Sequence, residues 1–474
     1  EVHFWERLQF EIPYVALDIA KQGERFRVLR EDVMHVAREF NGVLAALTPA
    51  ERRLFSERLL HLERKLSPGL TKYTWISRTA AETYLREARR LSRELMATIE
   101  KHQRSQLLID RCVRTVGTTA LISLKKKQVY TLAQFQAEQS VYHEEVRGSL
   151  TVIQNEVRNL LRESYSVFDA DSDDVQREWR ACVRRIDAKM EDALRLTVKR
   201  SLAELSRSIN GDAKTEVQPL FSIQVHLLKN RVEFMPSILG DSGLTQMINT
   251  VSKEAIATTA VVPRLVEMFE VERADAAERS DKASFYTSLS DDDDVLKVLV
   301  QVMGGMRAIL PGLQKFISTW DRYKHIWDVD KEAFMRRYAK LKRALTAFET
   351  DITRYKELQH DVQSEEGITI IGFIRIDAAP LKQALVTHCY EWQLKFTQLL
   401  NFNANTELTA LYTHMERVFE VFSRKAATLD ELAEQVRLHE VESAATERTE
   451  ARFESLETMY RMLEKFEVQV KEEE

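Results

Sequence analysis

Closely spaced carboxylates are the first residues in this chain whose pattern could do chemistry. Asp169, Asp171 and Asp173 stand at the first, third and fifth positions of a calcium-binding EF-hand loop. Such a loop also needs a central glycine and a closing glutamate, and this chain has Asp174 and Arg180 at those positions. We therefore interpret the aspartates as caps of the helix that follows, because carboxylates stabilise the positive end of a helix.

Phosphate binding and nucleophilic catalysis find no complete motif. Gly367 and Gly372 have the spacing of a phosphate-binding loop, but residues 373–374 are Phe-Ile where lysine and a hydroxyl residue must stand. Residues 240–243, Gly-Asp-Ser-Gly, do not form a nucleophile elbow, and the eleven histidines form no His-Glu-x-x-His zinc motif. We expect no catalytic residue, cofactor site or metal site, and hence no enzymatic activity of this segment.

One short motif suggests a partner. Ile153 and Gln154, followed by Arg158, match the first half of an IQ motif, the helix that calmodulin-like light chains grip. The distal basic residue should fall at position 163, which is Glu163, and Arg162 lies one position early. The same residues also supply an apolar helix stripe, so a light-chain site and a packed core helix both remain open.

The charges are unevenly distributed along the chain. Residues 72–127 hold 13 Lys and Arg against 5 Asp and Glu, whereas residues 439–474 hold 11 Glu against 5 Lys and Arg. Within the basic segment, Arg86, Arg90 and Arg93 fall on one side of a helix, and arginine suits bidentate contact with carboxylates. We hypothesise that this arginine ridge binds an acidic surface on another chain. The alternative interpretation is a solvated helix face.

Composition limits the class of protein. Charged residues make up 30% of the 474 residues, and only 13 glycines and 8 prolines interrupt them, which favours long amphipathic helices. The net charge of −5 indicates no nucleic-acid partner, and the basic segment lacks the aromatic residues of a base-stacking platform. Three scattered cysteines indicate a reducing compartment. We find no apolar run of the ~18 residues that a membrane span needs, so we expect no membrane partner.

Helical periodicity dominates the elements that must position these residues. Apolar stripes predict helices over 24–47, 82–110 and 174–209. Thr48-Pro49 with Glu51, and Thr428 with Glu431, predict capping boxes, and the acidic run 290–294 predicts another helix cap. The most regular stripe predicts one continuous helix over 331–362, with Leu345 buried in its middle.

Two segments favour strands instead. Residues 220–235 alternate apolar and polar side chains around Lys229-Asn230, which predicts a β-hairpin. Residues 368–376 are short and β-branched, which predicts one buried strand. An isolated hairpin is marginally stable in water, so this strand is a candidate third member, although no residue fixes the pairing.

Several stretches, in this order, resemble the tail of dynein heavy chains. They are Arg52-Arg53-Leu54-Phe55, residues 68–75 (Pro-Gly-Leu-Thr-Lys-Tyr-Thr-Trp), residues 219–237 around the hairpin, residues 323–327 (Tyr-Lys-His-Ile-Trp), Arg354-Tyr355 and residues 377–385 (Asp-Ala-Ala-Pro-Leu-Lys-Gln-Ala-Leu). The segment from Thr428 to Glu474 looks most like the gamma class of ciliary outer arms. Each stretch is weak alone, and the ordered set spans most of the chain.

This resemblance implies a force-bearing tail in the cytoplasm and cytoskeleton, at the axoneme of cilia and flagella. Such tails carry intermediate chains and light chains, pack against other heavy chains, and hold the motor on the doublet microtubule through axonemal docking proteins. The gamma class also implies a calmodulin-like light chain. The family's ATP-driven AAA+ motor lies C-terminal to the tail, and we expect this chain to be a piece of a longer polypeptide.

The sequence thus predicts a mainly α fold, an elongated rod of successive helical bundles with a small β-hairpin or sheet insertion. We expect N-terminal bundles over 1–213, the hairpin insertion over 214–240, a bundle with the long heptad helix over 241–367, and a strand with a C-terminal bundle over 368–474. The alternative is a spectrin- or tether-like scaffold unrelated to a motor, which would show fixed-length repeats and no hairpin.

Overall fold

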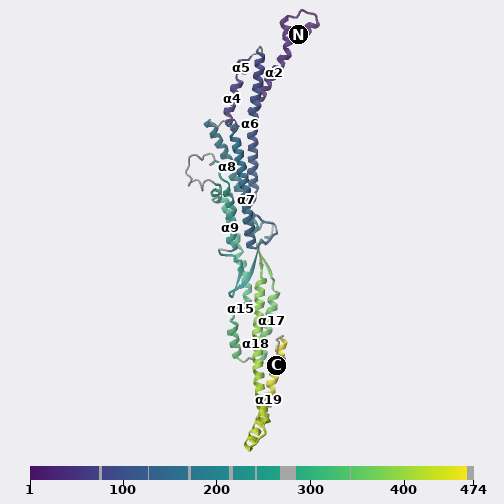
Figure 1. Ribbon diagram of the computed structural model, residues 1–474, viewed down its shortest axis with the longest axis vertical. Coiled ribbons are helices and arrows are strands. Elements are labelled where there is room, and N and C mark those ends of the chain that lie inside the picture. Colours follow the sequence, from purple (N-terminus) through teal and green to yellow (C-terminus); the bar gives the residue numbers. More distant parts are fainter. Residues whose placement is uncertain are drawn as a thin grey trace. The chain divides into compact units, whose positions relative to one another are not determined.

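The computed structural model describes residues 1–466, apart from 74–76, 126, 169–171, 213–216, 241–242, 267–283 and 342. The described residues are mostly helical, with one small sheet (Figure 1). They form two compact units, of which the first holds Glu1–Lys125, Gln134–Arg207 and Ile248–Met303, and the second holds the rest of the chain. Each unit is assembled from separated stretches, so the units do not coincide with the four consecutive segments expected from the sequence.

Long helices build the first unit. The elements wholly or mainly within it are α1 (Val2–Arg7), α2 (Tyr14–Ala46), α3 (Pro49–Leu54), α4 (Ser56–Leu66), α5 (Pro68–Thr71), α6 (Arg78–Thr118), α7 (Leu132–Tyr165), α8 (Asp173–Asn210), α9 (Leu244–Ala257), the 3-10 helix η1 (Thr258–Val261), α12 (Tyr286–Ser290) and α13 (Asp293–Ala308). The predicted stripe of α8 is confirmed, because its members are all buried: Val175, Trp179, Cys182, Ile186, Met190, Leu194, Leu205 and Ile209.

Local signals determine where α3 begins, and packing determines where it ends. The predicted capping box is present: the Glu51 amide donates to Thr48 Oγ1 (3.3 Å), and the Thr48 amide donates to the Glu51 carboxylate (2.8 Å). The chain is divided at Phe55 into two helices, α3 and α4. The division buries the Phe55 ring completely, with its centroid 5.1 Å from the ring of Phe168.

The second unit combines a helical core with the sheet. Its elements are β1 (Phe221–Leu228), β2 (Arg231–Met235), α14 (Leu310–Thr319), the 3-10 helix η2 (Trp320–Tyr323), α15 (Lys324–Trp327), α16 (Lys331–Lys340), α17 (Leu345–Ser364), β3 (Ile368–Ile371), β4 (Ile374–Asp377), α18 (Ala379–Ser423) and α19 (Leu429–Lys465). Thr428 and Glu431 form the predicted capping box at the start of α19.

The predicted continuous helix over 331–362 is wrong. Ring centroids of Tyr338 and Phe348 lie 5.1 Å apart, whereas a continuous helix would separate them by ~15 Å along its axis. The chain instead turns after α16, and both rings pack with the core that includes Phe396 of α18. Leu341 is consequently exposed, and Leu345 is only half-buried at the first position of α17.

Four described strands form one sheet in the order β2-β1-β4-β3. The predicted hairpin is confirmed, and its turn residues Lys229 and Asn230 have φ of 46° and 66°, as a two-residue hairpin turn requires. Residues 368–376 form two strands, not one, because the chain reverses at Gly372, whose φ is 57°. Strand β4 pairs in parallel with β1, so the suggested third member is confirmed.

One apolar stretch corrects the sequence analysis. Residues 293–327 are long and apolar enough to cross a membrane by length and composition alone. In the structure they are divided into α13, α14, η2 and α15, and Lys199 of α8 pairs with Asp294 at 2.7 Å. A helix that packs in a folded unit can pass the same composition test, so one such stretch is weak evidence for a membrane span.

Candidate interaction surfaces

The arginine ridge lies on α6, where carboxylates already compensate most of its charge. Arg90 pairs with Glu87 and Glu94 of its own helix, each at 2.6 Å. Its hydrogen bonds hold the pKa of the Glu87 carboxyl below its usual value. Arg93 reaches Glu39 of α2 at 3.1 Å, whereas Arg86 makes long contacts, at least 3.4 Å, within α6.

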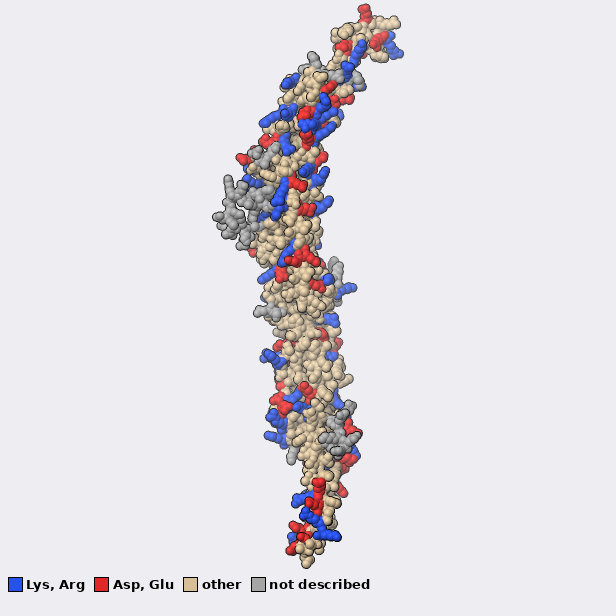
Figure 2. Space-filling view, viewed as in Figure 1, with Lys and Arg blue, Asp and Glu red and all other residues tan. Residues whose placement is uncertain are grey.

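These pairs change how the ridge would bind an acidic partner. A partner carboxylate would compete with Glu87, Glu94 and Glu39. Its binding free energy would therefore be less favourable than on unpaired arginines. On the face shown in Figure 2, acidic side chains lie among the basic ones along the chain. The ridge is therefore a surface of mixed charge, and its role in binding stays a prediction.

The IQ-like residues lie on α7, where one of them packs inside the first unit, and their role as a light-chain site stays a prediction. Gln154 is 3% exposed, and its Nε2 donates to the carbonyl of Pro263 at 3.1 Å. Ile153 and Arg158 are only partly buried, but the neighbouring Val157 is fully buried. A light chain that surrounds this helix would have to break these internal contacts. Leu150 and Leu161 are buried with Val157 on the core side of α7.

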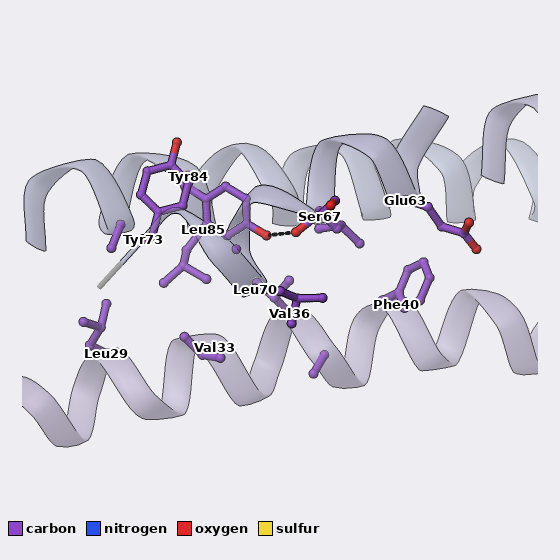
Figure 3. A pocket seen from close by; sticks show the side chains of 14 residues that line it. Leu29, Val33, Val36, Phe40, Glu63, Ser67, Leu70, Tyr73, Tyr84 and Leu85 are labelled. Carbon is purple, nitrogen blue, oxygen red and sulfur yellow. Dashed lines mark hydrogen bonds between the residues drawn. The ribbon is translucent and has the colours of Figure 1, made fainter. Parts of the chain in front are cut away.

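An apolar pocket of about 590 Å³ opens in the first unit among α2, α4, α5 and α6 (Figure 3). Most of its lining is aliphatic, including Leu29, Val33, Val36, Leu70 and Leu85. Such a lining suits an apolar side chain of a partner better than a charged substrate. Sequence reasoning missed the pocket, because an apolar stripe does not reveal whether another element covers it.

Gly69, in the first turn of α5, leaves room for the Tyr84 phenol at one end of this pocket. The Tyr84 hydroxyl donates to the carbonyl of Leu66 at 2.7 Å, the dashed line in Figure 3. A Cβ atom on Gly69 would overlap that hydroxyl. Burial raises the pKa of the Tyr84 phenol, so it stays a neutral donor at physiological pH. Only glycine therefore permits the phenol to close this end of the pocket.

The one described carboxylate of the candidate cation site lies in the first turn of a helix. Asp169 and Asp171 lie outside the described residues, and Asp173 opens α8. In the second acidic run, Asp292 accepts the amides of Asp294 and Val295 at 3.0 and 3.2 Å, as predicted for a cap of α13. Within the described part of the chain, no three His, Cys, Asp or Glu side chains cluster to hold a metal ion.

The remaining candidates for chemistry are structural residues. Gly372 supplies the β3–β4 turn, which accounts for a glycine spacing that resembled a phosphate loop. Cys112, Cys182 and Cys389 are buried free thiols, and burial raises the pKa of each thiol. Protonated thiols are poor nucleophiles. Residues 241–242, in the segment tested for a nucleophile elbow, lie outside the described residues.

Comparison with known protein families finds matches at both ends of the chain. Residues 1–84 match the family described as dynein heavy chain, N-terminal region 1. Residues 394–474 match the family described as dynein axonemal heavy chain 2/5/8 coiled-coil. The second match covers the latter part of α18 and all of α19, the two antiparallel helices that end the described chain.

Curated relatives match across the whole chain. It is 38% identical over 100% of its length to the dynein-1-beta heavy chain of the flagellar inner arm I1 complex of Chlamydomonas reinhardtii. It is 33% identical over 99% of its length to dynein axonemal heavy chain 2 of Mus musculus. Identity to the dynein gamma chain of the Chlamydomonas reinhardtii flagellar outer arm is 22% over 100% of this chain. The chain spans only 10–11% of the length of these relatives.

Proposed function

Since the chain belongs to the axonemal dynein heavy chains and corresponds to their N-terminal tail, we propose that it is the scaffold on which intermediate chains, light chains and neighbouring heavy chains assemble. It is a non-catalytic segment associated with the motor, in the axoneme of cilia and flagella. The parent protein would be an ATP-driven microtubule motor, docked on the doublet through this tail.

The observation that carries this proposal is the match to a dynein heavy chain along the full length of the chain. The fold supports it, because two units of long helices offer extended surfaces. The spectrin- or tether-like alternative is not favoured, because it predicts neither the sheet nor the dynein matches.

The finer assignment concerns the arm. Identity of 38% to an inner-arm I1 heavy chain exceeds the 22% to an outer-arm gamma chain. This difference favours an I1-type inner arm, and the gamma class suggested by residues 428–474 stays an unconfirmed prediction. The calmodulin-like light chain loses support with it, because its anchor, Gln154, is buried.

The test is assembly in ciliated cells that lack outer arms. Tagged chain 1–474 should enter these axonemes and co-purify with inner-arm intermediate chains. Entry only in cells that retain outer arms would contradict the inner-arm assignment. Failure to bind any dynein subunit in either background would contradict the scaffold proposal itself.

A further inference from the structure

The tip of the second unit is a helical hairpin with one apolar face. Helices α18 and α19 pair antiparallel there, through His414 Nε2 to Glu442 Oε2 at 3.2 Å, and through the Gln435 side chain to the Val421 carbonyl at 2.9 Å (Figure 1). The buried or half-buried positions of α18 that face α19 advance by three and four residues through this stretch, and they include Leu411.

On both helices, the residues that directly follow these contact positions lie on the same face of the hairpin. One step along an α-helix is a rotation of ~100°, and in an antiparallel pair this step moves both helices toward the same face. The contact of Phe422 with His439, 6.2 Å between ring centroids, places those two residues together on that face.

We name this surface the tip face and define it by four residues of α18 and two of α19. The exposed fractions are Tyr412 63%, Met415 50%, Phe419 74%, Phe422 41%, Leu432 49% and Val436 51%. The opposite face of the hairpin carries mainly charged residues, namely Arg417, Glu420, Glu434 and Arg437, with Val441 as an exposed apolar residue among them. An amphipathic hairpin exposes such a surface to water only at a cost, so the tip face has the properties of a binding surface.

The spacing of the tip face determines the conformation of what covers it. Tyr412, Met415, Phe419 and Phe422 advance by three, four and three residues, the repeat of a coiled-coil seam. A third helix can pack its own apolar repeat into this seam and into the groove beside Val436. An extended strand has a period of two and would match only some of these positions.

Charge determines which helix fits. Glu416 and Glu440 stand on the outer edges of α18 and α19, and neither forms an ion pair with a described residue. A second copy would bring its own Glu416 and Glu440 against these carboxylates, which disfavours self-association. We propose that the tip face binds an amphipathic helix of another protein, with an apolar heptad stripe flanked by lysine or arginine. This inference rests on the scaffold function and names one of its surfaces.

The experiment uses chain 1–474 and a labelled 21-residue synthetic helix with leucine at the seam positions and lysine at the flanking positions. Fluorescence anisotropy measures its binding. The face variant Met415→Glu with Phe419→Glu should weaken binding by at least about tenfold, because it places charges in the apolar seam. The matched control Thr413→Glu with Arg417→Gln makes the same net charge change of −2 on the opposite face, and it should bind within about twofold of wild type. Circular dichroism should show both variants equally helical.

A second pair of measurements tests the charge argument. A matched peptide with glutamate at the flanking positions should bind wild type more weakly. Glu416→Lys with Glu440→Lys should reverse the preference. Equal binding of both peptides to wild type would overturn the proposal, and so would equal loss in the face and control variants. A concentration-dependent dimer of wild type in sedimentation, abolished in the face variant, would overturn it in favour of a second copy.

The two proposals can fail separately. If wild type binds the lysine peptide but recruits no dynein subunit in cells, the scaffold function fails and the tip face stands as a helix-binding surface. If subunits are recruited while the peptide does not bind, the tip-face proposal alone fails.

Discussion

At the scale of the residue, Phe348 and Arg343 both contact Tyr338 but contribute very differently to the stability of its surroundings. The Phe348 ring is 4% exposed and packs edge-on against Tyr338, whereas the Arg343 guanidinium lies over the outer side of the same Tyr338 ring at 4.9 Å. Phe348→Ala should destabilise this core by ~3–5 kcal/mol through lost transfer energy and a cavity. Arg343→Ala should cost below ~1 kcal/mol, since it loses only an exposed cation–π contact.

Hydrogen exchange of α17 and α18 amides measures both effects locally. Leu345→Ala should fall between the two, because its side chain is half-buried. Equal protection in the Phe348 and Arg343 variants would contradict the packing of α16 against α17.

His102 makes the first unit sensitive to pH. Its ring is 2% exposed, and its Nδ1 lies 2.6 Å from Ser164 Oγ. Burial lowers the pKa of this imidazole below 6.5, an effect that Glu51 partly opposes. The unfolded chain therefore binds the proton first as pH falls, so the stabilisation is complete above pH ~6.5 and decreases below it.

Exchange of α6 and α7 amides should accelerate between pH 7.5 and 5.5, after correction for intrinsic exchange rates. His102→Asn should flatten much of that dependence. His143 of α7 is a further imidazole whose pKa burial lowers, so a residual slope is expected. An unchanged pH dependence of exchange in the variant would show that His102 is not the group responsible.

At the scale of the element, the β3–β4 turn depends on one glycine. Gly372 has φ of 57°, and a Cβ there would lie 3.1 Å from Ile309 Cγ2. Gly372→Ala should destabilise the sheet by ~1–2 kcal/mol, because L-residues are strained in this conformation. Gly367→Ala is the matched control, since a Cβ at Gly367 would meet no atom within 4 Å. Exchange of the β1 and β4 amides should separate the two variants.

The arginine ridge belongs to the same scale, as one face of α6. Replacing Arg86, Arg90 and Arg93 with alanine should leave the far-UV circular dichroism and melting temperature nearly unchanged, because exposed ion pairs contribute little to folding. Association with purified intermediate chain should slow and lose its salt dependence if the ridge binds carboxylates. Wild-type association kinetics in the triple variant would show that the ridge is only a solvated face.

At the scale of the whole molecule, the sequence predicts a rod of consecutive bundles. A compact domain of this length would have a radius of gyration of ~23 Å. Small-angle X-ray scattering of chain 1–474 should return a clearly larger value. A radius near the compact figure would contradict the rod.

The sequence by itself determined the features that depend on neighbours within a few residues. The capping boxes at Thr48 and Thr428, the α8 stripe and the Lys229-Asn230 turn all follow from hydrogen bonds and side-chain periods of this range. The family resemblance also needed only ordered short motifs.

Tertiary structure decided the features in which distant residues compete with a local pattern. The heptad pattern over 331–362 is continuous, yet the contact of Tyr338 with Phe348 requires a reversal within it. The half IQ motif reads as an exposed site, yet Pro263 is the partner of Gln154. A hydrophobic period states which side of a helix is apolar, and it does not state what covers that side. Burial in the core of α8 and exposure on the tip face therefore have the same local signal, and only the placement of other elements separates them.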